Sequence, residues 1–474
     1  MKRLPGLLLA AGLLAGTAMA QSPVTLTIGA KAPGAPIPDD YIGLSFETSN
    51  LLPDKDGKYL FSAGNKQLVS LFKTVGIKNL RVGGGTAEDP RYAIPGPADI
   101  DQLFAFAKAA DVRVIYTFRL LNGDKNAVAA LAKYIQQHYR AQLEYFCIGN
   151  EPDWHSYHNK DPEITDYPSY LHKWRIFADA ICVAVPEAKF GGPDTGSDYP
   201  VPKAKDTDYN GASWTEHFAL DAHTGGRLMA VLQHDYIGQG AKGVSIQEAI
   251  DAMLSANWIT VNYPALYNQV LARVQSEHLA YRMTECNDYT GGVDGASNAF
   301  ASALWALDYM YWQAEHRALG VNFHNKRWIY TDTIYPDHSG NFQINPKAYG
   351  LKAFELCSHG SEEPVTISNP GEINLTAYAV RGAKNLFVTI INKTHDASAS
   401  EADVTIVADK MKSQAEALFL IVPNGDPAAR KGMTLGGASI SNDGPWLGKW
   451  TPVTANKPVK VAPSSAAIVR IAAD

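Results

Sequence analysis

Two glutamates stand at the ends of strand-like runs in this chain, Glu151 and Glu285. Glu151 follows residues 145–148 and a glycine, and it lies between Asn150 and Pro152. Two carboxyl groups can divide the work on one bond, as proton donor and as nucleophile, when one is protonated and the other ionised near neutral pH. That chemistry requires a fold that brings the two glutamates together.

The stretch around Glu151 predicts a strand and its exit loop. Residues 145–148 (YFCI) are apolar and partly aromatic, and Gly and Pro bound them, which favours a buried strand over a helix. In α/β architectures, functional groups lie where the chain leaves the carboxyl end of such a strand. The alternative is that Asn150 and Asp153 form a turn while Glu151 merely faces solvent.

Strand-like runs alternate with helix-like segments over roughly 300 residues. Alternation of this kind predicts a parallel sheet, and eight units of this length favour a (β/α)₈ barrel over an open sheet. The triplet at 83–85 (GGG) lacks the spacing of a dinucleotide-binding fingerprint. The eight expected strands are residues 41–47, 79–82, 113–120, 145–148, 189–192, 228–236, 280–285 and 320–324.

The C-terminal part of the chain has a different pattern. Short β runs punctuated by Asn, Gly, Pro and Asp follow residue 365, which predicts an antiparallel β-sandwich. Residues 24–29 (VTLTIG) alternate in the same way. We therefore expect residues 21–36 to add a strand to the sandwich, residues 37–360 to form the barrel, and residues 361–474 to form the sandwich itself.

The N-terminus has the pattern of a signal peptide. A basic start at residues 1–3 precedes an apolar stretch at 7–14, and Ala18-Met19-Ala20 fits the cleavage rule. We expect residues 1–20 to be removed and the mature protein to be exported, to the periplasm or outside the cell. The apolar stretch is too short for a membrane anchor, so no membrane association is expected after cleavage.

Composition narrows the possible partners. The chain has 474 residues, 46% of them hydrophobic and 19% charged, and its net charge is −6. Such a chain is globular, and it presents no positive field for nucleic acid or for a long sulfated polyanion. Its four cysteines lie far apart without metal-ligand spacing, so we expect no metal and no cofactor. The oligomeric state is left open.

Polar residues stand at the ends of most expected strands. If the strands form a barrel, these residues converge at one mouth. Each has a structural alternative, because Asp89 and Asp194 could be turn or cap residues and His234 or His324 a hydrogen-bonded core histidine. The strand-end groups are Glu47, 83–89, Asn150, Glu151, Asp194, 234–236, Glu285, His324 and Asn325.

Glu151 and Glu285 stand apart because they fit one mechanism together. They end the fourth and seventh expected strands, and across a barrel mouth they could act on a glycosidic bond. A carboxyl separation of roughly 5 Å would mean retention through a covalent intermediate, and a wider gap would mean inversion.

Several motifs resemble one known family. Asn150-Glu151-Pro152 resembles the signature of retaining glycosidases of clan A, in which this glutamate is the acid/base and a glutamate ending the seventh strand is the nucleophile. Over nearly the whole mature chain, the sequence is similar to glycoside hydrolase family 79, which holds β-glucuronidases and heparanases. The motifs are GLSFE (43–47), LRVGGG (80–85), IGNEPD (148–153), FGGPD (190–194) and RMTECNDYTGG (282–292).

The resemblance implies roles near the two glutamates. Asn150 would hydrogen-bond the 2-hydroxyl of the sugar, and Tyr236 would hold the nucleophile Glu285 in place. Glu47 would contact a sugar hydroxyl, and Glu88 or Asp89 would do likewise.

It also implies a glucuronate site. Tyr289 and Gly291 would bind the uronate carboxylate, and Tyr330 or Tyr335 would complete the set. These neutral donors agree with the weak basic character of the chain.

The sequence thus predicts a retaining exo-β-glucuronidase that acts on glucuronic-acid-containing carbohydrate. An endo-acting heparanase-like enzyme ranks second, because the expected loops carry few Lys and Arg. Another clan A glycosidase, such as a xylosidase or arabinofuranosidase, becomes the better interpretation if Tyr289 does not bind a carboxylate. A catalytically dead sugar-binding barrel is disfavoured by the presence of both glutamates and Asn150.

Overall fold

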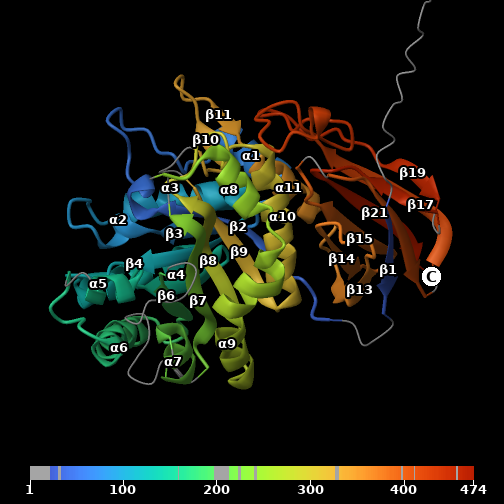
Figure 1. Cartoon of the computed structure of the whole chain (residues 1–474). Coiled ribbons are helices and arrows are strands. Elements are labelled where there is room, and N and C mark those ends of the chain that lie inside the picture. The colour runs from blue at the N-terminus through green and yellow to red at the C-terminus, as the bar shows by residue number, and fades with distance from the viewer. Residues whose placement is uncertain are drawn as a thin grey trace, which may run out of the picture.

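The protein has two lobes, a barrel and a β-sandwich, which lie side by side in the computed structural model (Figure 1). The predicted signal peptide, residues 1–20, lies outside the described residues. The structure describes residues 22–29, 34–157, 160–196, 213–221, 226–239, 243–325, 330–396, 399–409, 411–454 and 457–473.

The first lobe is a closed barrel of eight parallel strands, so the predicted (β/α)₈ barrel is confirmed. One strand end differs from expectation. Pro193 and Asp194, expected in an exit loop, lie inside β6 because the strand continues to Thr195 and pairs with β7 as far as that residue. The strands are β2 (Ile42–Glu47), β3 (Asn79–Gly83), β4 (Arg113–Phe118), β5 (Leu143–Ile148), β6 (Phe190–Thr195), β7 (Leu228–Gln239), β8 (Tyr281–Thr290) and β9 (Ala318–Asn325).

Helices cover the outside of the barrel, and α1 shows how the sequence defines one. Its apolar residues recur at helical spacing and are buried, the Asn65 side chain accepts a hydrogen bond from the Leu68 N–H, and Gly76 ends it in the left-handed conformation (φ +92°). The covering helices are α1 (Lys66–Val75), α3 (Pro97–Ala110), α4 (Lys125–Tyr139), α6 (Tyr167–Ala184), α7 (Trp214–Asp221), α8 (Ile246–Met253), α9 (Tyr263–Ser276), α10 (Phe300–Glu315) and α11 (Lys347–Glu355).

Two short helices follow strands that carry candidate site residues. The glycine triplet leads into the one-turn helix α2 (Gly85–Glu88). Helix α5 (Pro152–Tyr157) begins directly after Glu151. Both therefore leave the carboxyl ends of barrel strands.

The second lobe is the predicted sandwich. One sheet has the order β13-β1-β16-β20, and the other has the path β12-β14-β15-β21-β17-β18, with β19 also pairing β17. The N-terminal strand β1 joins the first sheet as predicted, although it pairs parallel with β16 and antiparallel with β13. The strands are β1 (Ser22–Ile28), β12 (Ser361–Glu363), β13 (Val365–Ser368), β14 (Leu375–Arg381), β15 (Asn385–Asn392), β16 (Ala402–Ala408), β17 (Met411–Ile421), β18 (Thr434–Leu435), β19 (Thr451–Thr454), β20 (Val459–Val461) and β21 (Ser465–Ala473).

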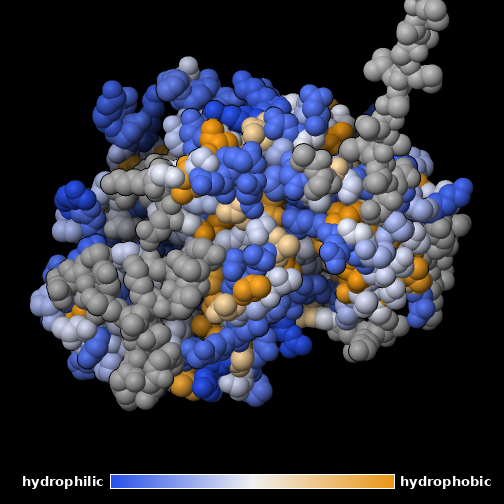
Figure 2. Space-filling view, in the orientation of Figure 1, coloured by the Kyte–Doolittle hydropathy of each residue, from blue (hydrophilic) through white to orange (hydrophobic). Residues whose placement is uncertain are grey.

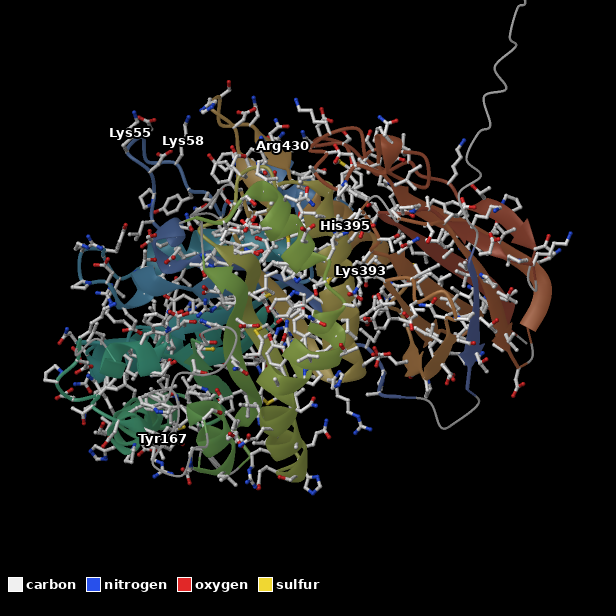
Figure 3. All side chains as sticks on the ribbon, viewed as in Figure 1. Lys55, Lys58, Tyr167, Lys393, His395 and Arg430 are labelled. Atoms are coloured by element: carbon white, nitrogen blue, oxygen red, sulfur yellow. The ribbon has the colours of Figure 1, made fainter. Side chains whose placement is uncertain are left out.

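Helices α10 and α11 lie on the side of the barrel that faces the sandwich (Figure 1). Asp308 of α10 is the main polar tie: Lys393 Nζ lies 2.7 Å from its Oδ2, and Tyr378 Oη 2.7 Å from its Oδ1. His395 also reaches Asp251 of α8 at 2.7 Å. Figure 3 shows Lys393 and His395 at this boundary.

The visible surface is mostly hydrophilic, with hydrophobic residues scattered between the lobes and over the barrel helices (Figure 2). Across the described part of the chain, we find no helix with the length and apolar character that a membrane crossing requires.

The Asp308–Lys393 pair yields a stability prediction. Both side chains are buried, so Lys393→Met would leave an uncompensated carboxylate between the lobes. We expect the free energy of unfolding to fall by about 3–5 kcal/mol, measured by urea denaturation. The control is Lys460→Met, because Lys460 is an exposed lysine of the sandwich whose ion pairs are screened by solvent, so its loss should lower the free energy of unfolding far less. Equal losses in the two variants would contradict the role of Asp308 as the tie.

Candidate active site

The barrel brings Glu151 and Glu285 together at one mouth. Glu151 follows β5 and Glu285 lies in β8, and one carboxylate oxygen of each lies within 4.8 Å of the other and of a ring nitrogen of His234. Glu285 is buried, whereas the Glu151 side chain is 29% exposed. The two carboxylates therefore share one site but differ in access to solvent.

The backbone holds Glu151 in an unusual conformation. Its φ is +49°, a left-handed value that costs energy for a residue with a side chain, and Asp194 has φ +64°. The two strained residues support each other, because the Glu151 N–H donates a hydrogen bond to the Asp194 carbonyl at 2.8 Å. Position 196 requires a glycine, because a Cβ there would lie 3.2 Å from Glu151 Cδ and 2.4 Å from Trp154 Nε1.

A buried arginine, Arg81 of β3, lies at the centre of the site. Its Nη1 donates to Glu285 Oε2 at 2.7 Å and to Ser45 Oγ at 3.1 Å. Its Nη2 donates to Asn150 Oδ1 at 2.6 Å and to Asp194 Oδ2 at 2.5 Å. One guanidinium thus joins residues from five barrel strands or their exits.

His234 connects Asp194 to Glu151. Its Nε2 lies 3.1 Å from Asp194 Oδ1, and its Nδ1 lies 2.9 Å from Glu151 Oε1. Burial lowers the pKa of His234, but the charges of Asp194 and Glu285 outweigh burial and raise it to about 10. The imidazole is therefore protonated at neutral pH and donates through both nitrogens.

The pKa of Glu285 shifts in the opposite direction from that of an isolated buried carboxyl. Burial raises its pKa, but neighbouring His324, His234 and Arg81 together hold the pKa well below the ordinary value. Tyr236 also donates a hydrogen bond to Glu285 Oε1 at 2.8 Å. Glu285 is therefore ionised at neutral pH, the state that a nucleophile needs.

Glu47 lies on the far side of His324 from Glu285. His324 Nδ1 is 3.6 Å from Glu285 Oε2, and its Nε2 is 3.8 Å from Glu47 Oε1. Glu47 Oε2 also accepts from the Thr86 N–H at 2.7 Å. The structure places Glu47 beside the site through His324, but it is only 3% exposed.

Asn150 and the acidic residues after β3 have distinct surroundings. The Asn150 N–H donates to Glu88 Oε1 at 3.1 Å, and Glu88 also accepts from the N–H groups of Leu120 and Leu121. Glu88 therefore ties the ends of β4 and β5 together. Asp89 pairs with the exposed Arg91.

The residues expected to bind a uronate carboxylate lie in the last part of β8 and in the segments that follow β8 and β9. Tyr289 is in β8 and is 6% exposed, with its ring against Gly238, and Gly291 follows with φ +81°. A Cβ on neighbouring Gly292 would lie 2.9 Å from the Tyr330 Cβ, so Tyr330 borders the same turn. Tyr335 lies in the hairpin strand β10 (Ile334–Pro336).

The same site has a geometry that could suit a metal, but its charges do not favour one. Glu151, His234 and Glu285 are the one group of described residues with three closely spaced potential ligand atoms. Arg81 is 2.7 Å from Glu285, and His234 is protonated. A divalent cation would have to displace both positive groups.

Arg81 was missed as a site residue, although it lies within one of the family-like motifs. Its signal was the presence of an arginine inside an apolar strand, since a parallel barrel strand is buried and a buried charge needs a partner. Asp194, His234 and His324 were noted at strand ends, and the structure places all three in the charge network: Asp194 lies in a strand rather than a turn, and both histidines are buried with polar partners.

No family model and no curated protein sequence matches this chain. Its fold is nevertheless that of solved glycoside hydrolases. A 4-O-α-L-rhamnosyl-β-D-glucuronidase from Fusarium oxysporum 12S shares 16% identity at a TM-score of 0.72, over 94% of this chain and 99% of that one.

Two other structures have comparable likeness. The family 51 arabinofuranosidase from Xanthomonas axonopodis pv. citri shares 14% identity at a TM-score of 0.66, over 95% of this chain and all of that one. The family 44 xyloglucanase from Paenibacillus polymyxa shares 12% identity at a TM-score of 0.62, with the same coverage. At these identities the likeness shows a shared fold and selects no family.

The charge network gives a titration prediction. In Asp194→Asn, His234 loses its strongest anionic neighbour, so we expect its pKa to fall from about 10 toward the ordinary 6.5. NMR titration of ¹⁵N-histidine-labelled protein measures this shift, with His234→Asn used to assign the signal. An unchanged midpoint in Asp194→Asn would contradict the network.

The same shift has a consequence for stability. A folded-state pKa above the ordinary value means that protonated His234 stabilises the fold below about pH 6.5, and that this contribution is lost as pH rises toward about 10. Asp194→Asn should therefore show a smaller loss of stability than the wild type over that window.

Proposed function

We propose that the protein is a retaining exo-β-glucuronidase that acts by double displacement. The observation that carries this proposal is the pairing of Glu151 and Glu285, because one carboxylate oxygen of each lies within 4.8 Å of the other. Retaining glycosidases place their carboxyl groups about 5–5.5 Å apart, whereas inverting enzymes need about 6.5–9.5 Å to admit a water.

In the first step, ionised Glu285 attacks the anomeric carbon and forms a glycosyl ester while Glu151 protonates the departing oxygen. His234 holds Glu151 Oε1, so Oε2 carries the transferred proton. The proton transfer of the first step leaves Glu151 ionised, and in the second step Glu151 takes a proton from the attacking water as general base. The water then releases the sugar with its anomeric configuration retained.

Arg81 and Tyr236 set the orientation of the nucleophile. Each binds a different oxygen of Glu285, at 2.7 and 2.8 Å, so the carboxylate cannot rotate freely. Asn150 is fixed by the same guanidinium, which supports its expected contact with the sugar 2-hydroxyl.

The choice of glucuronate rests on the family resemblance and is supported by two further points. The turn after β8 brings Tyr289, Gly291 and Tyr330 near one another. One protein of the same fold is a β-glucuronidase by name. A second candidate, an arabinofuranosidase-like activity, is favoured by the likeness to the family 51 structure.

The sequence supports a location for the reaction and a class of partner. The N-terminal leader pattern supports export, so the substrates would be glycans or glycosides outside the cytoplasm. The net charge of −6 supports a carbohydrate partner over nucleic acid or a strongly sulfated chain.

Removal of either glutamate should abolish turnover. We expect Glu285→Ala and Glu151→Ala each to lower kcat/KM for p-nitrophenyl β-glucuronide by about 10⁴-fold or more. The matched control is Glu187→Ala, because Glu187 is exposed on the outside of the barrel and its loss should leave turnover unchanged. Near-normal turnover by either catalytic variant would remove the assignment.

The anomeric configuration of the product tests the retaining mechanism, and the preference among sugars tests the assignment of glucuronide as substrate. ¹H NMR of the first product should show the β anomer, because the geometry predicts retention. The β-glucuronide should be cleaved far faster than p-nitrophenyl β-glucoside, β-xyloside or α-L-arabinofuranoside. An α product would exclude double displacement, and a preference for the arabinofuranoside would favour the second candidate.

A further inference from the structure

A fully buried lysine, Lys347, contacts two of the segments that border the candidate active site. It is the first residue of α11, and none of its surface is exposed. Its Nζ lies 3.0 Å from Asp288 Oδ2, donates to the Thr331 carbonyl at 2.8 Å, and also donates to Asn287 Oδ1. One ammonium thus joins the last part of β8 to the segment that follows β9.

On β8, the partners of Lys347 lie close to the nucleophile. Asn287 stands two residues after Glu285, and its Nδ2 donates to the backbone carbonyl of His324 at 2.7 Å. Asp288 Oδ1 accepts from the backbone N–H of Tyr289 at 2.6 Å. Lys347 therefore acts on the backbone of Tyr289 through Asp288, at the point where the strand leads into its exit turn.

After β9, Lys347 is one of several buried groups that hold an irregular segment. Each of the four carbonyls of residues 331–334 accepts a hydrogen bond. The donors, in order, are Lys347 Nζ at 2.8 Å, Asn345 Nδ2 at 2.7 Å, the Asn345 N–H at 3.0 Å and Asn325 Nδ2 at 2.5 Å. A segment bound at every carbonyl has little freedom to move, which also fixes the chain directly after Tyr330.

The turn after β8 lies directly against this segment. The Gly292 N–H donates to the Tyr289 carbonyl at 2.9 Å, and Gly292 has φ +73°. A Cβ at position 292 would lie 2.9 Å from both Tyr330 Cβ and Thr331 Cγ2. The close approach therefore requires a glycine, and Lys347 joins the same two segments through other atoms.

The surroundings of Lys347 favour a role in position over one in stability. Both Lys347 and Asp288 are completely buried, and desolvation of two such ions offsets much of their attraction. The Nζ also lies 5.5 Å from the ring centroid of Trp305 and 5.9 Å from that of Phe323. An ammonium carries three donors, and three oxygens surround this one, so it fixes the geometry of all three.

This geometry matters for a carboxylate that is bound by neutral groups. Such a ligand depends on several hydrogen bonds from donors in different segments, and each bond weakens steeply when its distance or angle changes. Tyr289 and Gly291 belong to the β8 turn, whereas Tyr330 belongs to the segment after β9. The spacing of the two segments therefore decides whether these groups can bind one carboxylate together.

We propose that Lys347 is a positioning residue for glucuronate, because its ammonium sets the spacing between the β8 turn and the segment that begins at Tyr330. This inference rests on the proposed function and adds to it a residue outside the site that determines specificity for the carboxylate. Lys347 is completely buried, so it acts through Asn287, Asp288 and Thr331 rather than on the substrate.

The first test is Lys347→Met, which removes the ammonium and keeps an unbranched side chain. KM for p-nitrophenyl β-glucuronide should rise about tenfold while kcat changes less than about threefold, because neither Glu151 nor Glu285 is a printed partner of this lysine among the described residues. The Kd of D-glucuronate, measured by calorimetry, should rise by a similar factor. kcat/KM for p-nitrophenyl β-xyloside, which has no carboxylate, should change less than about twofold.

The matched control for this variant is Lys352→Met. Lys352 is a second largely buried lysine of α11, and its Nζ pairs with Glu355 of the same helix at 2.6 Å. Its replacement should change KM for the glucuronide less than about twofold. The double variant Lys347→Met/Asp288→Asn removes the uncompensated carboxylate as well. It should be more stable to heat than Lys347→Met but should keep the raised KM.

Gly292→Ala tests the same spacing without touching the lysine. The added Cβ would push Tyr330 and Thr331 away, so this variant should also raise KM for the glucuronide and spare the xyloside. Its control is Gly340→Ala. Gly340 has φ +81° but open space around an added Cβ, so this control shares the backbone strain without the displacement.

The outcomes separate this proposal from the function on which it rests. An unchanged KM for the glucuronide in Lys347→Met would overturn the role of Lys347 alone, and so would equal losses on glucuronide and xyloside. Recovery of both stability and KM in the double variant would show that Lys347 serves only as a counter-ion for Asp288, which also overturns it. Failure of the wild type to cleave the glucuronide or to bind D-glucuronate would contradict the proposed function and this proposal together.

Discussion

The site depends on one buried cation, the guanidinium of Arg81. Four anionic or polar partners surround it, and two of them, Asp194 and Glu285, are buried carboxylates that could not stay ionised in that environment alone. The arginine in turn is fully buried and depends on their charges. This mutual requirement fixes the relative positions of β3, β6 and β8, so the catalytic geometry is part of the barrel core.

The network also divides the two glutamates by role. Glu285 is surrounded by positive groups and is held ionised, whereas the carboxylate of Glu151 is more exposed and lies against His234. Asp194 links the two halves, because its side chain binds Arg81 and His234 while its carbonyl holds the Glu151 backbone. A double-displacement enzyme needs this asymmetry, since one carboxyl must attack while the other exchanges a proton.

Local sequence patterns were sufficient to predict the fold and the two glutamates, Glu151 and Glu285. The apolar run before Glu151 and the run ending at Glu285 were read as strands because their length and flanking residues allow little else, and the barrel order then placed both at one mouth. The position of Asp194 was ambiguous because it also depended on a local pattern. A Gly-Pro-Asp sequence favours a turn, and only pairing with β7 extends the strand through it.

What the sequence determined by itself was the succession of strands and helices, the change to a sandwich, and the two carboxylates at strand ends. These follow from periodicity and residue type, which act over a few residues. Tertiary structure decided the partners: that Arg81 meets Glu285, that His234 lies between Asp194 and Glu151, and that Lys347 joins the end of β8 to the segment after β9. Those contacts depend on barrel closure and strand register, which local spacing does not encode.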